Sequence, residues 1–342
     1  MHQIIKENIL IAGIAGASLG TEIFKSLSDT SKYNIFGADI SPYAYGLYQN
    51  GFKKTFSPRE DKYIEDILNF AKNENIKIII PGGEIPLKLL SNKKTLFENE
   101  GIKLAINNLK VIDLCTDKIK TFNKLKELNI PIPKTELYLN KNQLDHISYP
   151  SIIKPSKNSG GSINVYLAEN KSEALYICES MKKNNQSILI QEYLNSEKGE
   201  FTIGVLSDAH GKIIQSIIMK KVFPSKLSYI LKNKKHLISS GYSQGEFINS
   251  KELNIQAEHI AQSIQSTGPL NIQARIKNNI LYPFEINPRF SATTYLRTLA
   301  GFNEIDIYLQ YLFTNKLPNN INIKTGFCLR SLTEQFIPKD QL

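Results

Sequence analysis

Three polar residues at alternate positions end an apolar, β-prone run in the last third of the chain. They are Glu285, Asn287 and Arg289, and the run before them is 281–284. Alternate side chains of an extended chain share a face, so the carboxylate and the amide would point the same way. Such hard oxygen ligands suit Mg²⁺, and a guanidinium suits phosphate oxygens. On this stretch alone, a strand that ends in an ordinary Asn-Pro turn is an equally good interpretation.

A second strand is predicted to precede this run and to pair with it as a hairpin. Lys277-Asn278-Asn279 supplies the turn signal between the two strands. With the turn centred near Asn278, Gln273 would lie opposite positions 283–285, close enough to join the acid and the amide described above. The alternate positions of the earlier strand carry three polar side chains: Asn271, Gln273 and Arg275.

A lysine next to a loop of small residues forms another candidate for phosphate chemistry. Lys154 lies in a strand predicted at 149–155, the loop 156–162 is rich in serine and glycine, and a strand resumes at 163–167. The amides of such a hairpin loop can wrap phosphate oxygens while the lysine adds positive charge. A mobile surface hairpin with a solvated lysine is the alternative.

The elements that must position these residues change character near residue 112. Before it, strands and helices alternate, which favours a parallel sheet covered on both faces. After it, an amphipathic helix is expected from Asp113, with that acid as its cap, and one more strand is expected at 325–337. The helices expected in the first part are 19–27, 61–73 and 85–99. The expected strands are 8–17, which runs into a glycine turn, 33–40, 76–80 and 103–106.

The first tight turn supports a competing hypothesis, a nicotinamide-dependent oxidoreductase. Gly13, Gly16 and Gly20 form a loosened dinucleotide fingerprint, and Asp39 ends the next strand where a ribose-binding acid would lie. The alternative is that any doubly wound domain needs glycines at a tight first turn. Such an enzyme would give no reason for the polar residues at 285–289.

Composition places the chain among ordinary globular proteins of about two domains. It has 342 residues, 41% apolar and 22% charged, and it lacks a run of about 20 apolar residues for a membrane helix. No signal peptide is recognisable, and three widely spaced cysteines fit a reducing cytoplasm. The net charge of +10 raises a third hypothesis, a non-catalytic or nucleic-acid-binding protein. Its lysines are scattered, apart from a cluster at 226–235, and no nucleic-acid motif accompanies them.

Taken together, these features resemble the ATP-grasp superfamily, of the type represented by the carbamoyl-phosphate synthetase large chain and biotin carboxylase. The resemblance covers essentially the whole chain. It implies an α/β protein in which a Rossmann-like preceding domain is followed by an ATP-grasp fold, with a small lid domain and a larger α+β domain. The implied domains are 1–112, 113–190 and 191–342. In such proteins the glycine turn generally helps to form the acceptor cleft and binds no nicotinamide.

The resemblance also implies a role for each matching residue. Lys154 and Arg289 would supply catalytic positive charge, and Gln273, Glu285 and Asn287 would bind the metal. Tentative substrate residues are Lys221, Arg275, Ser291, Thr293, Thr294 and Arg297. The implied ATP contacts are Lys118, Lys154, the phosphate lid Ser159, Gly160, Gly161 and Ser162, then Glu192, Tyr193, Leu194, Glu200 and Gln273.

The function implied by the resemblance is ATP-dependent ligation of a carboxylate to an amine, or to a thiol, through an acyl phosphate. ADP and phosphate would be released, with Mg²⁺ or alternatively Mn²⁺ as the metal. The expected partners are small-molecule substrates, without nucleic acid or membrane, in the cytoplasm. A homodimer is common among relatives. The chain carries no biotin-carrier, glutaminase or second synthetase half, so a short ligase is expected instead of a complete carbamoyl-phosphate synthetase.

Overall fold

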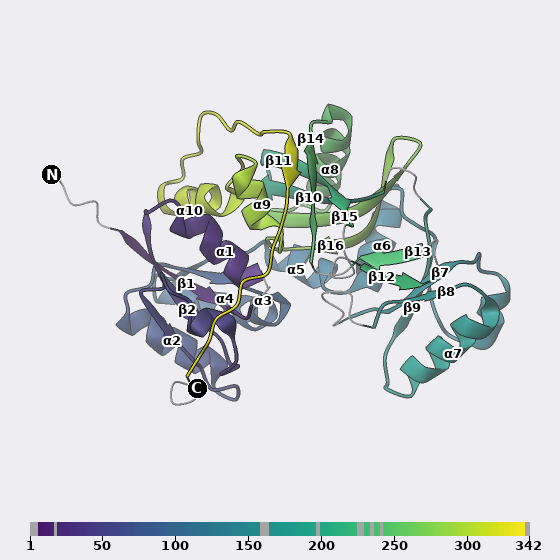
Figure 1. The fold of residues 1–342 in the computed structure, drawn as a ribbon, viewed down its shortest axis with the longest axis horizontal. Helices are drawn as coiled ribbons and strands as arrows, with labels where there is room; N and C mark the ends of the chain where they lie inside the picture. Colours follow the sequence, from purple (N-terminus) through teal and green to yellow (C-terminus); the bar gives the residue numbers. More distant parts are fainter. Residues whose placement is uncertain are drawn as a thin grey trace.

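The computed structural model describes residues 6–16, 19–157, 164–195, 199–223, 229–232, 236–239 and 242–338. Figure 1 shows three bodies: a first domain that carries the N-terminal strand, a sheet in the middle, and a smaller sheet with α7 at the opposite end. The middle sheet has six strands and the smaller one has four. They are called the large sheet and the small sheet below.

The first domain is a five-stranded parallel sheet with helices on both faces, as the alternating pattern predicts. Alternate residues of its central strand enter two different cores, Ile9 with α1 on one face and Leu10 with α2 and α3 on the other. In sheet order the strands are β3 (Lys54–Phe56), β2 (Tyr33–Ala38), β1 (Glu7–Ala12), β4 (Ile78–Pro81) and β5 (Lys103–Leu104). The helices are α1 (Leu19–Ser28), η1 (Tyr45–Leu47), α2 (Tyr63–Asn73), α3 (Glu84–Ser91) and α4 (Lys94–Asn99).

The helix predicted at 85–99 is two helices in the structure, α3 and α4. The chain leaves helical geometry at Lys93, which has φ −119° and ψ 19°. The amphipathic pattern continues across this break, since Leu87, Leu90 and Phe97 all enter the same core. Periodicity therefore identified the buried face correctly and missed the interruption.

The helix predicted from Asp113 is also divided, into α5 (Leu109–Cys115) and α6 (Lys118–Glu127). The acid that caps the second helix is Asp117, whose carboxylate accepts hydrogen bonds from two backbone N–H groups of the first turn. The predicted cap at Asp113 is wrong, because that residue lies inside α5. A cap at Asp117 places Lys118 at the first helical position.

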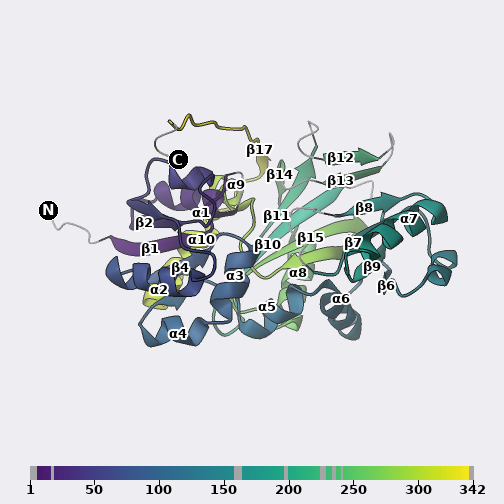
Figure 2. The ribbon, with the colours of Figure 1, turned by 90° about the horizontal axis from the view of Figure 1, so that it is seen from below.

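Both of these helices lie beneath the large sheet. Val111 and Phe122 belong to the same buried cluster as Ile272 of β15 (Pro269–Lys277). Figure 2 shows α5, α6 and α8 (Lys251–Ser263) along that side of the sheet. The domain boundaries expected at 112 and 190 fall within α5 and β9. The division into three domains remains our proposal.

The small sheet is antiparallel and is covered by α7. Its core includes Ile153 and Cys178 and is separate from the other cores of the described chain. The loop expected to act as a phosphate lid, Ser159 to Ser162, lies outside the described residues. In sheet order the strands are β6 (Thr135–Leu137), β9 (Ile188–Glu192), β7 (Ser151–Pro155) and β8 (Tyr166–Ala168), and the helices are η2 (Lys141–Asp145) and α7 (Lys171–Lys182).

The large sheet contains the predicted hairpin of residues 269–287 at one edge. At the other edge, the strand expected at 325–337 is regular over three residues only, because only those pair with a neighbouring strand. A separate two-stranded ribbon, β12 (Tyr229–Lys232) and β13 (His236–Ser239), contacts the large sheet through Ser239, whose hydroxyl bonds Lys221 and Glu200. In sheet order the strands are β16 (Ile280–Asn287), β15 (Pro269–Lys277), β10 (Glu200–Ser207), β11 (Ile213–Val222), β14 (Gln244–Ile248) and β17 (Gly326–Cys328), with helix α8 (Lys251–Ser263) below.

The large sheet and the first domain share one hydrophobic core. Helices α9 (Thr294–Leu299) and α10 (Glu304–Thr314) follow the hairpin and pack against α1. The cluster there joins Ile23 of the first domain to Leu206 and Phe247 of the large sheet. These two bodies are therefore packed into one unit.

The segment after β17 also holds the first domain and the large sheet together. The Arg330 guanidinium pairs with Glu22 of α1 at 3.0 Å and donates hydrogen bonds to the carbonyls of Ala292, at 2.8 Å, and Ser243, at 3.1 Å. Farther along, the Gln335 amide donates to a carbonyl of the first domain. One side chain thus joins three segments that are distant in sequence.

Candidate functional site

The hairpin of β15 and β16 has the register expected from the sequence. Gln273 pairs with Glu285, and Asn271 pairs with Asn287, so the prediction that Gln273 lies opposite 283–285 is confirmed. The turn is made by Asn278 and its neighbour Asn279, both with positive φ, as short hairpin turns require. Glu285 and the predicted amide ligands Gln273 and Asn287 therefore lie close together on the hairpin.

A cleft opens between the small sheet and the large sheet. It encloses about 700 Å³ of space, part of which is open to solvent. The predicted residues that line it are Lys118, Lys154, Glu192, Tyr193, Leu194, Glu200, Gln273, Arg275 and Glu285. Sequence reasoning missed six further lining residues: Pro133, Ile152, Val165, Gln191, Ser239 and Phe284.

Lys154 is the most deeply buried cation of the cleft, with 4% of its surface exposed. Its ammonium donates to the Gln191 side chain at 2.8 Å and to the Phe284 carbonyl at 2.9 Å, and it lies 5.3 Å from the ring centroid of Phe122. Burial, followed by repulsion from Lys118, lowers the pKa of Lys154 to about 7, although Glu285 opposes the shift. An anion bound here would favour the charged ammonium.

A buried acid lies at the other side of the cleft. Glu200 accepts a hydrogen bond from Lys221 at 2.6 Å and one from Ser239, and its second oxygen lies 3.6 Å from Arg275. Burial alone would raise the pKa of Glu200, but the two cations and the hydrogen bonds outweigh it and lower that pKa. Glu200 is therefore an ionised carboxylate.

Lys221 does not line the cleft and is not the accessible substrate clamp that was expected. It is 6% exposed and lies behind the cleft wall, where its ammonium also donates to the Gln273 carbonyl oxygen at 2.8 Å. Gln273 in turn donates from its amide nitrogen to Glu285, which lies 3.9 Å from Lys118. A continuous polar chain thus runs from Glu200 to Lys118.

The strand end at residues 192–194 forms a third side of the cleft. Arg275 donates to the Leu194 carbonyl at 2.6 Å, and its guanidinium lies 4.3 Å from the ring centroid of Tyr193. The Glu192 carboxylate accepts a hydrogen bond from the backbone N–H of Lys134 at 3.2 Å. An apolar and aromatic surface with backbone groups at its rim suits a flat heterocycle.

A second, smaller hollow adjoins the cleft and shares Lys118 and Glu285 with it. It is also lined by Asn287 and Arg289 of the hairpin and by Glu84 of the first domain. Burial lowers the pKa of Arg289, while attraction from Glu285 and Glu84 opposes that shift. The first domain therefore contributes an acid beside the end of the hairpin.

The donor set at the end of the hairpin fits a hard divalent cation that also has phosphate ligands. Glu285 is an accessible carboxylate, with 21% of its side chain exposed, and the Asn287 amide has no hydrogen-bond partner among the described residues. In the part of the chain described, no three His, Cys, Asp or Glu side chains group as a complete metal site. Mg²⁺ commonly takes one or two carboxylates and completes its shell with phosphates and water.

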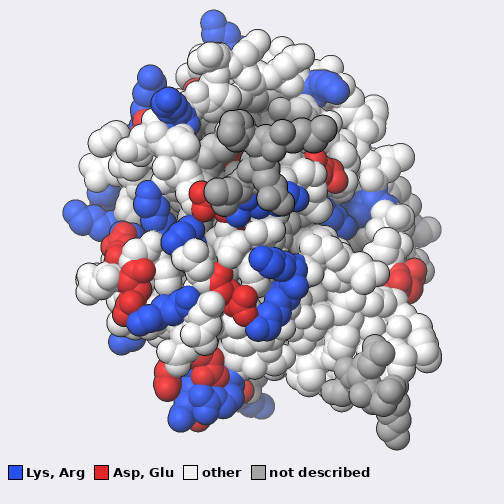
Figure 3. Space-filling model, turned by 90° about the vertical axis from the view of Figure 1, so that its left-hand side faces the viewer, with Lys and Arg blue, Asp and Glu red and all other residues white. Residues whose placement is uncertain are grey.

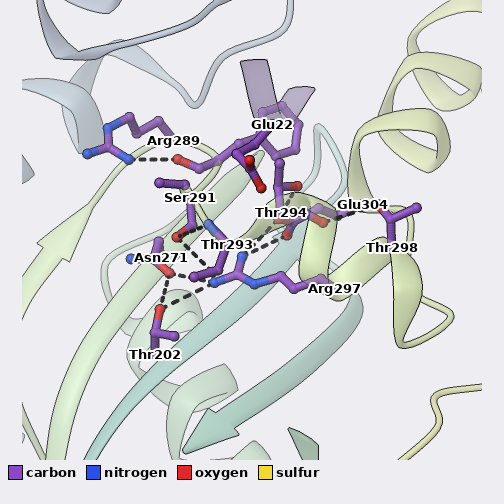
Figure 4. A network of polar contacts seen from close by, with 12 residues as sticks. Glu22, Thr202, Asn271, Arg289, Ser291, Thr293, Thr294, Arg297, Thr298 and Glu304 are labelled. Carbon is purple, nitrogen blue, oxygen red and sulfur yellow. Dashed lines mark hydrogen bonds and ion pairs between the residues drawn. The ribbon is translucent and has the colours of Figure 1, made fainter. Parts of the chain in front are cut away.

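The residues expected near the substrate after the hairpin are buried and form a closed network (Figure 4). Arg297 is 1% exposed, pairs with Glu304 at 2.8 Å and donates to Asn271 at 2.6 Å. Thr294 also donates to Glu304, and the Ser291 and Thr293 hydroxyls bond each other. None of these four predicted residues lines the cleft or the second hollow. Figure 4 shows that Arg289 points away from this network.

The glycine turn of the first domain is used for packing. A Cβ at Gly20 or at Gly82 would come within 1.8 Å of the Gly13 carbonyl oxygen, so these backbones are in direct contact. Both oxygens of Asp39 accept backbone hydrogen bonds, from Ile14 at 2.8 Å and Ser41 at 3.0 Å. The Asp39 carboxylate thus ties the turn to the next loop, which gives a structural reason for an acid at this position.

Positive charge is interspersed with negative charge on the face drawn in Figure 3. The first domain also carries the ion pairs Lys54–Glu74, Arg59–Asp66 and Lys72–Glu100. The side chains of the lysine cluster at 226–235 lie outside the described residues. None of the described helices is both long and apolar enough to span a bilayer.

Three family profiles match parts of the chain, and the second and third overlap at 184–209. Residues 9–105 match the PylC-like, N-terminal domain, and 115–209 match the RimK-like ATP-grasp domain. Residues 184–335 match the family described as ATP-grasp in the biosynthetic pathway with Ter operon. The two ATP-grasp profiles therefore cover the small sheet, the large sheet and the cleft between them.

Known proteins agree with this assignment. The carbamoyl phosphate synthase large chain of Buchnera aphidicola is 30% identical over 67% of this chain and 21% of its own length. The chain thus spans about a fifth of the curated relatives it matches. The biotin carboxylase–βγ-ATP complex from Campylobacter jejuni has a TM-score of 0.69 at 17% identity, over 94% of this chain and 74% of that one. D-alanine–D-alanine ligase from Bacillus anthracis has a TM-score of 0.61 at 17% identity, over 90% and 96%. The chain belongs to the ATP-grasp superfamily.

Proposed function

We propose that this protein is an ATP-dependent ligase that joins a carboxylate to an amine, or to a thiol, and releases ADP and phosphate. The observation that supports this best is the convergence of a buried cation, a buried ionised acid and a hard donor set in one cleft. Lys154, Glu200 and Glu285 come from three different strands of two sheets, and no single segment could bring them together. The names of the relatives point to the same class of chemistry.

Each side of the cleft is proposed to bind one part of ATP. The Tyr193–Leu194 edge and Glu192 would meet the adenine, and Glu200 would accept hydrogen bonds from the ribose hydroxyls. Lys118 and Lys154 would hold the phosphates. The loop Ser159 to Ser162 is proposed to cover them, on the sequence evidence alone. In this arrangement the small sheet would contact both ends of the nucleotide, through Glu192 and Lys154, and Glu200 of the large sheet would contact the ribose.

The hairpin end is proposed to be where phosphoryl transfer occurs. Glu285 and Asn287 would hold Mg²⁺, which when bound offsets the negative charge that develops during the transfer. Arg289 would hold the transferred phosphoryl group by its planar fork. The carboxylate oxygen attacks the γ-phosphorus as the bond to ADP breaks, and the amine then displaces phosphate from the acyl phosphate.

The second substrates are proposed to enter through the hollow next to the hairpin. It shares Lys118 and Glu285 with the nucleotide cleft, so a group there would lie next to the γ-phosphate. Arg289 would attract the carboxylate. Ser291, Thr293, Thr294 and Arg297 are left out of the proposed substrate contacts because they are buried in their own network. A cytoplasmic location and a homodimer remain proposals as well.

The decisive experiment compares ligands and then substrates. Mg-ATP should raise the unfolding temperature of the protein, and EDTA should remove most of that rise. ADP release should then be screened over amino acids, peptides and sugar acids paired with amines. Stabilisation by NADP⁺ and none by Mg-ATP would contradict the proposal and favour the oxidoreductase hypothesis.

A further inference from the structure

The Gln273 side chain lies between a fixed cation and a fixed anion. Its oxygen accepts a hydrogen bond from the Lys221 ammonium at 2.8 Å, and its nitrogen donates one to the Glu285 carboxylate. An ammonium has only donors and a carboxylate has only acceptors. The amide therefore has one orientation in which both bonds form, and reversing it would place like groups against each other on both sides.

Lys221 is itself held in place by other groups. Its ammonium also donates to Glu200 at 2.6 Å and to Ser239 at 3.2 Å. The side chains of Lys221 and Glu200 are each 4% exposed. Turning the Gln273 oxygen away would take one partner from a buried ammonium, which is costly in a medium of low polarity. The position of Lys221 thus determines the orientation of the amide.

We infer that Gln273 is a positioning residue that orients Glu285 for the metal through its N–H donor, and that Lys221 keeps its oxygen away from the metal. This inference rests on the proposed function, because it assumes that the hairpin end takes a divalent cation with a nucleotide. It replaces the expectation that Gln273 is itself a metal ligand. The cation is then held by Glu285 and Asn287 together with phosphate oxygens.

Charge supports the same assignment. A divalent cation on the Gln273 oxygen would also lie against the Lys221 ammonium, which is 2.8 Å from that oxygen. The metal ion and the ammonium would then share one oxygen as neighbour, and two positive charges that close repel strongly inside a protein. A cation on the opposite side of Glu285 avoids this repulsion and still benefits from a carboxylate whose direction is set by a hydrogen bond. Outer groups of this kind typically change metal affinity by about 10–100-fold.

The test is a double-mutant cycle on metal affinity. Mn²⁺ is titrated into the full-length protein saturated with ADP, and bound metal is followed by electron paramagnetic resonance. The variants are Lys221→Met, Gln273→Met and the double variant. Lys220→Met is the matched control, because it removes the neighbouring lysine of β11, whose side chain lies on the other face of the strand. ADP affinity without metal is measured for each variant, so that a general loss of binding is recognised.

If Lys221 acts through Gln273, each single variant weakens Mn²⁺ binding by about 10-fold or more. The double variant should then be no weaker than the weaker single one. Lys220→Met should bind Mn²⁺ within about twofold of the wild-type affinity.

Additive losses, or Mn²⁺ affinity in Lys221→Met equal to or above the wild type, would overturn the inference and leave the proposed function standing. If the wild type binds neither Mn²⁺ nor ADP, the proposed function fails first. If Lys221→Met does not fold, a wild-type complex with Mg²⁺ and ADP decides the question. An Oε1–metal distance near 2.1 Å at Gln273 would contradict the inference, whereas a retained Lys221 contact would support it.

Discussion

Two buried ion pairs both contact strand β15 and differ in what surrounds them. Glu200–Lys221 and Arg297–Glu304 both have side chains at most 4% exposed, and both contact residues of β15. The first pair continues through Gln273 to a cleft wall, whereas the second ends in threonine hydroxyls and an asparagine between the sheet and two helices. A functional site and a purely structural contact can thus both contain a buried ion pair. What distinguishes the first pair from the second is its hydrogen-bonded connection to the cleft.

The largest effect should come from breaking the closed network. Arg297→Met leaves the Glu304 carboxylate buried without its cation, and such losses typically cost about 3–5 kcal/mol of unfolding free energy. ADP affinity of the folded variant should match the wild type. Chemical denaturation and ADP titration measure the two quantities, and Arg59→Met, which breaks an exposed pair, serves as control. Weaker ADP binding with unchanged stability would place Arg297 in the nucleotide site, and the two ion pairs would then no longer differ in role.

Removing charge from the open network should affect catalysis more than stability. Glu285→Gln keeps the shape of a partly exposed side chain and is expected to lower metal-dependent ATP turnover about 10²-fold or more, as for other lost electrostatic groups in active sites. The rate of ADP release with the best substrate pair measures this. Glu98→Gln in α4 is the matched control, since it lies on the surface far from the cleft. Turnover within threefold of the wild type would argue against a metal at this residue.

The cleft lysine makes nucleotide binding depend on pH. In the empty protein Lys154 has a pKa of about 7, chiefly because it is buried. Bound phosphate favours the ammonium, so binding takes up a proton above pH 7, and ADP affinity should fall as pH rises, by up to about tenfold per unit. Calorimetry at pH 6.5 and 8.5, in buffers of different ionisation enthalpy, counts the proton. Lys154→Met should remove the pH dependence; an unchanged slope would assign it to another group.

The smallest effect should come from the rim of the open network. Tyr193→Leu removes the ring that lies 4.3 Å from the Arg275 guanidinium. Cation–π contacts at partly exposed sites are worth about 0.5–1 kcal/mol, so ADP affinity should fall about 2–5-fold. Fluorescence titration measures it, with Tyr176→Leu on the exposed face of α7 as control. A loss of 100-fold or more would show that Tyr193 does far more than stack on Arg275.

The hairpin and its register could be predicted because their causes are local. The Asn278-Asn279 turn aligns the two strands and brings Gln273 opposite positions 283–285. A register shift between Gln273 and Ala274 then places Glu285, and not Phe284, opposite Gln273. Alternation along a strand could not reveal that Lys221 lies behind the wall, because its partner Glu200 comes from a neighbouring strand. Position along a strand gives the face of a side chain but not its surroundings.

The errors in the element predictions have a similar origin. Residues 325–337 include alternating apolar side chains such as Phe327 and Leu329, but only 326–328 find a partner strand, and these two side chains are left exposed. A strand requires a neighbour, which the local pattern cannot supply. Arg297 was misassigned because its acid, Glu304, is close in sequence yet lies on the next helix. A basic residue that follows a phosphate motif has the same local sequence pattern whether it contacts the substrate or forms a buried structural ion pair.

The contacts of Arg330, in the segment after β17, restrict which parts of this protein can move relative to each other. Its guanidinium joins α1, the segment after β16 and the segment before β14, so the first domain and the large sheet keep one relative position. The small sheet, with its own core, is the body left to move. Fluorescent labels on the segment after β17 and on α4 would therefore give a constant transfer efficiency. Labels on α7 and α4 would report each opening and closing of the cleft.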